Sequence, residues 1–252
     1  MKALITGASS GIGRDMARYL ASMGWDLILV ARREDRLEEL KRELKNVSVR
    51  CIKADISSYE ECLRLYDETK NEKVDMLINN AGFGLAGEFL KTDLERELQM
   101  VDVNVKALHT LTKLYLKDFV ARDSGIILNV ASSAGFMAGP LMATYYATKN
   151  YVLRLSEAIS EELRRKGSKV KICALCPGPV KTEFDQVASV KFSMDGISSE
   201  YCARYAIDNA LKGKRIIIPS SSIKTGVFFK RFLSENFLLK IAYNFQRRKN
   251  YQ

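Results

Sequence analysis

Residues 1–16 read MKALITGASSGIGRDM, and this stretch decides the fold. Residues 2–5 form a short apolar run of strand type, and a glycine-rich turn follows at once. The turn has the spacing G-x-x-x-G-x-G, and helical periodicity begins at residue 14. Glycine permits a tight turn and lets backbone N–H groups approach a phosphate at a helix N-terminus. The stretch therefore indicates a strand, a phosphate-binding turn and a helix, the opening of a βαβ unit.

The same alternation continues along the chain. Apolar runs typical of buried strands lie at residues 2–5, 27–30, 47–52, 76–78, 125–130, 170–175 and 216–218. Helical spacing occurs at residues 14–23, 34–44, 59–70, 94–119 and 145–165. Such alternation is typical of a parallel sheet with helices on both faces. We expect an α/β fold: a Rossmann-type, doubly wound domain with about seven parallel strands, which binds its ligands at the strands' carboxyl ends.

No linker divides the 252 residues, of which 47% are hydrophobic, so we expect a single domain over residues 1–252. Within it, residues 1–185 are expected to form the cofactor-binding and catalytic core. Residues 186–222 are expected to form a substrate lid and the last strand, and residues 223–252 a basic amphipathic tail.

The net charge of +10 is concentrated near the C-terminus. Residues 212–252 hold ten Lys and Arg against one acidic residue, Glu235, whereas the remainder is nearly neutral. Aromatic residues are interleaved with these basic residues. We expect the tail to pack as a helix on the domain or on a partner subunit, or else to lie on an anionic membrane surface. The nearly neutral body makes nucleic acid a poor partner.

The sequence indicates neither a targeting segment nor a metal site. The first apolar run enters the glycine-rich turn directly, and no run approaches the roughly 18 apolar residues of a spanning helix. We expect a cytoplasmic protein, peripheral to a membrane at most. Five scattered cysteines are no disulfide framework, and we expect Cys173 and Cys176 to be buried and structural, with no metal site. The only histidine, His109, is expected on a helix, in packing or at the surface.

The turn Thr6–Gly13 (TGASSGIG) resembles the cofactor motif of the short-chain dehydrogenase/reductase family. Asn79-Asn80-Ala81-Gly82 after the fourth strand is similar to that family's second signature, and Asp55 lies where the family contacts adenine. The matching motifs occur in order over residues 2 to about 185. The resemblance implies a nicotinamide cofactor bound by Gly7, Ser9, Ser10, Gly11, Ile12, Gly13, Arg32, Arg33, Asp55, Ile56, Asn80, Ala81, Gly82, Tyr145, Lys149, Pro177, Gly178, Val180 and Thr182.

The end of the second strand indicates which cofactor is preferred. NAD enzymes place an acidic residue there for the ribose 2′-hydroxyl, whereas NADP enzymes need positive charge for the 2′-phosphate. This chain has Ala31 followed by Arg32 and Arg33. The forked donors of arginine match phosphate oxygens. We therefore expect NADP(H), with Arg32 as the principal contact and Arg33 and Ser9 or Ser10 assisting.

Tyr145 and Lys149 have the spacing Y-x-x-x-K, which puts both side chains on one helix face. A phenol with its ordinary pKa of ~10 is a poor base at neutral pH, and a nearby cation lowers that pKa. Tyr145 could then exchange a proton with a substrate oxygen. Its neighbour Tyr146 is the less favoured alternative, since it departs from the family's spacing.

Two further residues complete the expected catalytic group. Ser132, thirteen residues before Tyr145, resembles the family's serine, which implies that it bonds and polarises the substrate carbonyl. Asn104 in Val103-Asn104-Val105 resembles the family's helix asparagine, which implies a water that links Lys149 to solvent.

These residues predict an NADPH-dependent reduction of a ketone to an alcohol. A hydrophobic or acyl-type substrate is favoured by apolar residues in and near the lid: Met137, Leu141, Met142, Phe184, Val187, Val190, Phe192, Met194 and Ile197. One alternative is a sugar-nucleotide epimerase or dehydratase, but such chains usually have another glycine spacing and a larger substrate domain. A second alternative is a non-enzymatic NADP sensor, against which the intact Ser132, Tyr145 and Lys149 argue. The resemblance also implies a homodimer or homotetramer, formed through helices near residues 105–119 and 150–165.

Overall fold

The computed structural model describes residues 1–184, 188 and 196–247. Its main sheet has seven parallel strands in the order β3-β2-β1-β4-β5-β6-β9. The strands are β1 (Lys2–Thr6), β2 (Asp26–Ala31), β3 (Val49–Lys53), β4 (Met76–Asn79), β5 (Ile126–Val130), β6 (Lys171–Leu175) and β9 (Ile216–Ile217). The chain order reverses between β1 and β4, which makes this a doubly wound sheet with its switch point there. The predicted Rossmann-type fold is confirmed.

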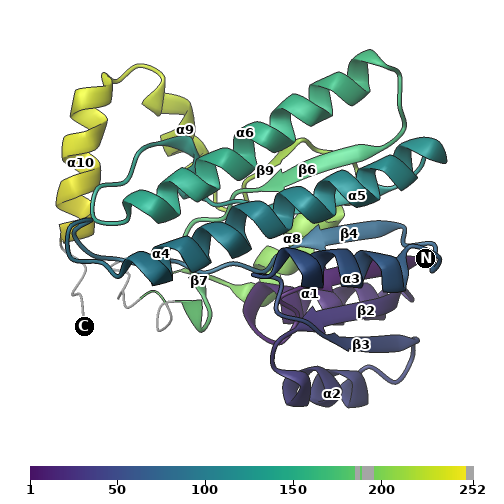
Figure 1. Ribbon diagram of the computed structural model, residues 1–252. Helices are drawn as coiled ribbons and strands as arrows, with labels where there is room; N and C mark the ends of the chain where they lie inside the picture. Colours follow the sequence, from purple (N-terminus) through teal and green to yellow (C-terminus); the bar gives the residue numbers. More distant parts are fainter. Residues whose placement is uncertain (185–187, 189–195, 248–252) are drawn as a thin grey trace.

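Helices cover both faces of the sheet (Figure 1). One layer contains α1 (Gly11–Ser22), α2 (Glu34–Glu43) and α8 (Ser199–Leu211), and the other contains α3 (Tyr59–Thr69), α5 (Leu108–Ala121) and α6 (Ala143–Arg165). In β1, Ala3 and Ile5 pack into the first layer and Leu4 into the second. Because alternate residues point to opposite faces and both faces are buried, the strands must be apolar throughout.

One predicted helix is interrupted in the structure. Instead of a single helix over residues 94–119, there is α4 (Leu94–Val101), a π-helical turn η1 (Asp102–Ala107) and then α5. The π turn holds Asn104, whose side-chain oxygen accepts from the Phe83 amide at 3.1 Å and whose Nδ2 donates to the Phe83 carbonyl at 2.9 Å. Such π turns occur mostly inside α-helices and often at functional sites.

The region after β6 contains elements that the sequence patterns did not indicate. A small two-stranded sheet pairs β7 (Val180–Lys181) with β8 (Ile197–Ser198). Helix α8 follows, and the Ser198 hydroxyl caps it by accepting from the Tyr201 amide. Small apolar residues, including Cys202 and Ala206, are fully buried in the layer shared with α1. Part of the expected lid region, residues 186–222, is therefore a core helix.

The chain continues after β9 in a helical hairpin of α9 (Ser221–Lys230) and α10 (Glu235–Arg247). The hairpin stands at one end of the molecule, beside the start of α6 (Figure 1). Leu238, Ala242 and Gln246, spaced four apart, form the buried face of α10. The tail thus packs on the body of the protein as a helix, the first of the expected alternatives. Among the described residues, no helix is long and apolar enough to cross a membrane.

The cysteines and the histidine lie where the sequence suggested. All five cysteines are free, and Cys173 and Cys176 are fully buried. Burial raises the pKa of both thiols to about 12, so neither is a reactive thiolate at neutral pH. His109 is exposed on α5, with its Nδ1 2.7 Å from the Tyr151 hydroxyl.

Candidate active site

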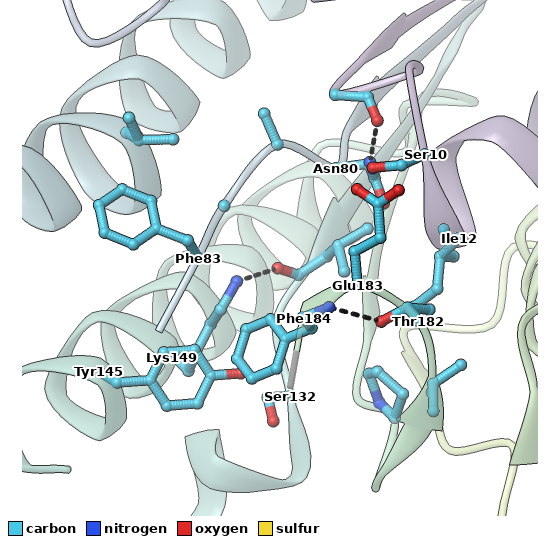
Figure 2. A pocket seen from close by; sticks show the side chains of 18 of the residues that line it. Ser10, Ile12, Asn80, Phe83, Ser132, Tyr145, Lys149, Thr182, Glu183 and Phe184 are labelled. Carbon is cyan, nitrogen blue, oxygen red and sulfur yellow. Dashed lines mark hydrogen bonds between the residues drawn. The ribbon is translucent and has the colours of Figure 1, made fainter. Parts of the chain in front are cut away.

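A cavity of about 480 Å³ opens at the carboxyl ends of β1, β4, β5 and β6. It is lined by residues of the glycine-rich turn, by Ser132 and Tyr145 (Figure 2), and by residues of the C-terminal hairpin. All the residues expected to bind the cofactor line it, except Gly13. Of the expected catalytic residues, Asn104 alone does not line it.

The glycine-rich turn has a backbone that side chains would disrupt. Gly7 and Gly11 have φ of +67° and +52°, a region that residues other than glycine rarely adopt. A Cβ on Gly7 would lie 2.8 Å from the Ala81 Cα, so the turn and the end of β4 could not meet with a larger residue. The first turn of α1 starts here, and its free N–H groups border the cavity.

Asn80 supports this turn from the neighbouring strand. Its Nδ2 donates to the carbonyl oxygens of Thr6 at 3.0 Å and Gly7 at 3.2 Å. A Cβ on Gly13 would overlap Asn80 Nδ2 and lie 2.5 Å from the Gly7 carbonyl oxygen. The structure therefore gives Gly13 a packing role behind the turn instead of a place on the cavity wall, because α1 must approach the turn closely.

Arg33 and Arg32 both line the cavity but occupy different places. The Arg33 guanidinium donates to the hydroxyls of Ser10 at 2.8 Å and Ser9 at 3.2 Å, at the mouth of the turn. Arg32 is the more exposed of the two, and its Nη1 lies 4.0 Å from an Asp55 carboxylate oxygen. Arg33 therefore contacts Ser9 and Ser10, the serines that were expected to help bind the 2′-phosphate.

Two charged neighbours of Arg33 were not found from the sequence. Glu183 lies beside Ser10 in the cavity (Figure 2), and its carboxylate pairs with Arg36 at 2.6 Å and Arg33 at 3.0 Å. The bonds from Arg36 and Arg33 hold the pKa of Glu183 below its usual range. Arg36 follows Arg33 by one helical turn, a spacing that could have been noticed. Glu183 comes from 150 residues away, and no linear pattern connects it to the arginines.

Ser132, Tyr145 and Lys149 converge from two elements. Ser132 follows β5 and caps the short 3₁₀ helix η2 (Ser133–Phe136), accepting from the Ala134 amide at 3.1 Å. Tyr145 and Lys149 lie in the first two turns of α6, and both are buried. The Lys149 Nζ donates to the Val130 carbonyl at 2.9 Å and lies 5.9 Å from the Tyr145 ring centre. Figure 2 shows the three side chains close together in the cavity.

Burial shifts the pKa of both helix residues. It raises the pKa of Tyr145 to about 12, and a bond to the Ser132 hydroxyl opposes this shift only in part. Burial also lowers the pKa of Lys149 to about 8. The expected lowering of the tyrosine pKa by the neighbouring cation is therefore not found, because loss of hydration disfavours the phenolate and the ammonium alike. The phenol is a proton donor over the neutral range.

Asn104 lies behind the cavity wall, near Lys149. A Cβ on Gly82 would lie 2.8 Å from Asn104 Oδ1 and 3.4 Å from Lys149 Nζ, so both polar groups approach the same glycine. Asn104 Nδ2 also donates to the Thr148 hydroxyl at 3.1 Å. The asparagine thus connects η1 to α6 one residue before Lys149, which makes it a positioning residue.

The far end of the cavity is mostly apolar, although Arg96 also lines it and lies 4.1 Å from the Phe83 ring centre. Residues from separate segments line it: Phe83, Val103, Met142, Tyr146, Phe184, Ile223 and Phe245. Of the apolar residues expected near the substrate, Met142 and Phe184 lie here. Ile197 instead packs against the core on the α1 side, because β8 turns it away. Met137 and Leu141 do not line this cavity, and the expected residues at 187, 190, 192 and 194 lie outside the described residues.

The C-terminal hairpin contributes to this end, which the sequence did not reveal. Phe245 of α10 and Ile223 of α9 line the cavity. The buried Gln246 donates through Nε2 to the Tyr146 hydroxyl at 2.6 Å. This bond spans 100 residues, so only the folded chain brings its partners together.

Comparison with known proteins agrees with this geometry. The family model for short chain dehydrogenase matches residues 1–191. An uncharacterized oxidoreductase of Staphylococcus saprophyticus is 36% identical over 201 residues, which cover 79% of this chain and 81% of that protein. The very-long-chain 3-oxoacyl-CoA reductase of Rattus norvegicus is 32% identical over 216 residues, 81% of this chain and 67% of that protein.

A solved structure is similar as well. The short-chain dehydrogenase from Sphingobium yanoikuyae in complex with NADPH superimposes with a TM-score of 0.82 at 30% sequence identity. The match covers 87% of this chain and 88% of that one.

Proposed function

The chain belongs to the short-chain dehydrogenase family, a family of oxidoreductases with nicotinamide cofactors, and from that membership we propose an NADPH-dependent reductase that converts a hydrophobic ketone or acyl-type carbonyl into an alcohol. One observation carries the proposal: a single cavity joins the glycine-rich turn, the group of Ser132, Tyr145 and Lys149, and an apolar wall. The order of these parts is what carbonyl reduction requires, since the reacting carbon must lie between the cofactor and the proton donor.

The cavity fits a dinucleotide at the end near β1. The turn leaves no room for a Cβ on Gly7, and the N-terminus of α1 offers N–H groups to a pyrophosphate. Asp55 and Ile56, which line the cavity, are proposed to contact the adenine, and the lining residues between Pro177 and Thr182 the nicotinamide carboxamide. When bound, the cofactor supplies the hydride that reduces the carbonyl carbon.

Preference for NADPH over NADH is proposed from charge. Ala31 leaves no carboxylate at the end of β2, while Arg33, supported by Ser9 and Ser10, offers donors for a 2′-phosphate. Arg36 pairs with the Glu183 carboxylate, which also pairs with Arg33, so two guanidinium groups offset the charge of this one carboxylate. The NADPH bound to the related dehydrogenase from Sphingobium yanoikuyae supports this choice.

The chain's own residues can move the proton. Ser132 is positioned to donate a hydrogen bond to the carbonyl oxygen, which polarises the C=O bond. Tyr145, protonated throughout the neutral range, then gives its phenolic proton to that oxygen as negative charge develops there. The Lys149 ammonium stabilises the phenolate that remains, and its bond to the Val130 carbonyl holds it in place, while Asn104 bonds Thr148, the residue before Lys149. A solvent proton returning through Lys149 would restore Tyr145.

The class of substrate is proposed from the apolar wall and from the relatives. Aromatic and aliphatic side chains dominate the far end of the cavity, which favours a hydrophobic molecule over a sugar. The rat 3-oxoacyl-CoA reductase acts on a carbonyl of a long acyl chain, as its name states, which supports an acyl-type substrate. We also propose that residues 1–252 act as one domain, in a cytoplasmic homodimer or homotetramer.

The test is oxidation of NADPH and of NADH, followed by absorbance, with ketones, β-ketoacyl thioesters, steroids and quinones as substrates. We expect turnover with NADPH and a loss of about 10²–10⁴-fold in kcat for Tyr145→Phe, the usual contribution of a general acid. Tyr146→Phe is the matched control, since it removes a neighbouring hydroxyl and should keep most of the rate. Tight binding of NADPH without turnover of any compound would instead favour a non-enzymatic sensor of the cofactor.

A further inference from the structure

The C-terminal hairpin exposes large apolar side chains on its outer side. Its turn and the flanking residues, 228–237, are called the hairpin tip and have the sequence FFKRFLSENF. Phe228, Phe229, Phe232 and Phe237 are between 49% and 70% exposed. Scattered exposed hydrophobic residues are ordinary, but four phenylalanines within ten residues are a concentrated patch.

Three of these rings, those of Phe228, Phe229 and Phe232, form a connected group at the end of the hairpin. The Phe228 ring lies 5.4 Å from that of Phe229 and 6.0 Å from that of Phe232, measured between ring centres. In Figure 1 the turn between α9 and α10 projects from its end of the molecule. Within the described residues, α9 has no buried side chain and α10 turns only its face of Leu238, Ala242 and Gln246 inward. The group of rings is therefore exposed on the outer surface of the hairpin.

The hairpin that carries these rings is basic, with Lys230 and Arg231 in the tip itself. The hairpin, residues 221–247, carries five basic side chains, Lys224, Lys230, Arg231, Lys240 and Arg247, against one acidic side chain, Glu235. The Arg231 guanidinium lies 4.7 Å from the Phe228 ring centre, so positive charge is placed directly on the aromatic group. Charge of one sign interleaved with aromatic rings is the composition of segments that lie in the interface of anionic membranes.

We propose that the hairpin tip docks on a lipid bilayer with anionic headgroups, inserting its phenylalanines between the lipids while the basic residues bind the headgroups. A symmetric contact between two copies of the hairpin is disfavoured, because each hairpin carries five basic side chains against one acidic side chain. The base of the hairpin borders the cavity through Ile223 and Phe245, so the docking tip and part of the apolar end of the cavity belong to one helical hairpin. The proposal does not depend on which substrate is reduced.

The test is flotation of the full chain with vesicles of phosphatidylcholine alone or mixed with phosphatidylserine. We expect binding to the anionic vesicles that is at least about tenfold stronger and that weakens with salt. Lys230→Gln with Arg231→Gln should lower the partition coefficient by about fivefold for each charge removed. The triple variant Phe228→Ser, Phe229→Ser and Phe232→Ser should lower it at least about tenfold, since its rings can no longer enter the interface.

A control removes three exposed apolar side chains elsewhere, through Tyr59→Ser, Val120→Ser and Tyr201→Ser, and should bind vesicles like the unmodified chain. Thermal unfolding of all variants establishes that they are folded, with no reliance on enzymatic activity. Absence of binding to anionic vesicles, or equal binding by the tip variant and the control, would overturn the proposal. So would a dimer of the unmodified chain that the tip variant converts to a monomer in sedimentation, since the tip would then be a subunit interface.

Discussion

The two ends of the cavity are built in different ways. The cofactor end is made by a single short turn, in which backbone groups and glycines face the cavity and Asn80 supports them from behind. The substrate end is made by side chains from several separate segments, including a C-terminal hairpin more than 200 residues from the turn. The first end tolerates few substitutions, because its glycines leave no room for a Cβ. The side chains that line the second end could be substituted without disturbing the sheet.

This difference explains how one fold can keep a cofactor and change its substrate. A substitution at the cofactor end should act on nucleotide affinity or on folding, and a substitution at the substrate end should act on KM for the carbonyl compound. Each of the following experiments can separate the two ends or show that they are coupled.

The largest effect is expected for Arg33→Ala. Hydrogen bonds to a charged partner contribute about 1.5–3 kcal/mol, so the Kd for NADPH should rise by about 10–100-fold while the Kd for NADH hardly changes. Titration calorimetry with each nucleotide measures both constants. Arg32→Ala, at the exposed rim, is the control and should have a smaller effect. Equal losses for NADPH and NADH would show that Arg33 does not recognise the 2′-phosphate.

Gly13→Ala tests how tightly the cofactor end is packed. The new methyl group would overlap Asn80 and crowd the Gly7 carbonyl, so the free energy of unfolding should fall by about 1–3 kcal/mol. Gly226→Ala in α9 is the control, because its Cβ would meet nothing within 4 Å. That change should raise stability by up to about 1 kcal/mol, through the better helix propensity of alanine. Urea unfolding measures both, and an unchanged Gly13→Ala midpoint would contradict the packing role.

The pH dependence tests the group between the two ends. Lys149 has its pKa lowered to about 8, so its ammonium is present below that pH and is lost above it. If the ammonium assists reduction, kcat/KM should be level below pH 8 and fall about tenfold per pH unit above it. Lys149→Arg keeps its charge and should show a lower rate without that step. A profile of the unmodified enzyme that stays level to pH 10 would exclude a role for this proton.

The smallest effect is expected at the hairpin. Gln246→Leu removes the hydrogen bond to Tyr146, which contributes about 0.5–1.5 kcal/mol. The KM for the carbonyl substrate should change by about 2–10-fold, while the Kd for NADPH stays the same. Asn244→Leu, on the exposed side of α10, is the control. A change in NADPH affinity for Gln246→Leu would show that the two ends of the cavity are coupled.

Much of the fold and of the candidate site follows from local patterns. All seven strands of the main sheet lie where apolar runs predicted them, and the glycine spacing located the turn at the end of β1. Tyr145 and Lys149 could be paired because a helix places residues four apart on one face. The π turn at Asn104 could not be predicted, since it depends on two bonds to the Phe83 backbone, 21 residues away.

The sequence by itself determined the parallel sheet, the phosphate-binding turn and the Tyr145–Lys149 pair, because strand and helix periodicity and glycine geometry act between near neighbours in the chain. Only the tertiary structure decided the pairing of Glu183 with Arg33 and Arg36, the packing role of Gly13, the lining of the substrate end by Phe245, and the bond from Gln246 to Tyr146. These contacts join segments about 70 to 160 residues apart. Their energies depend on burial and on the direction of side chains, which exist only once the chain has folded.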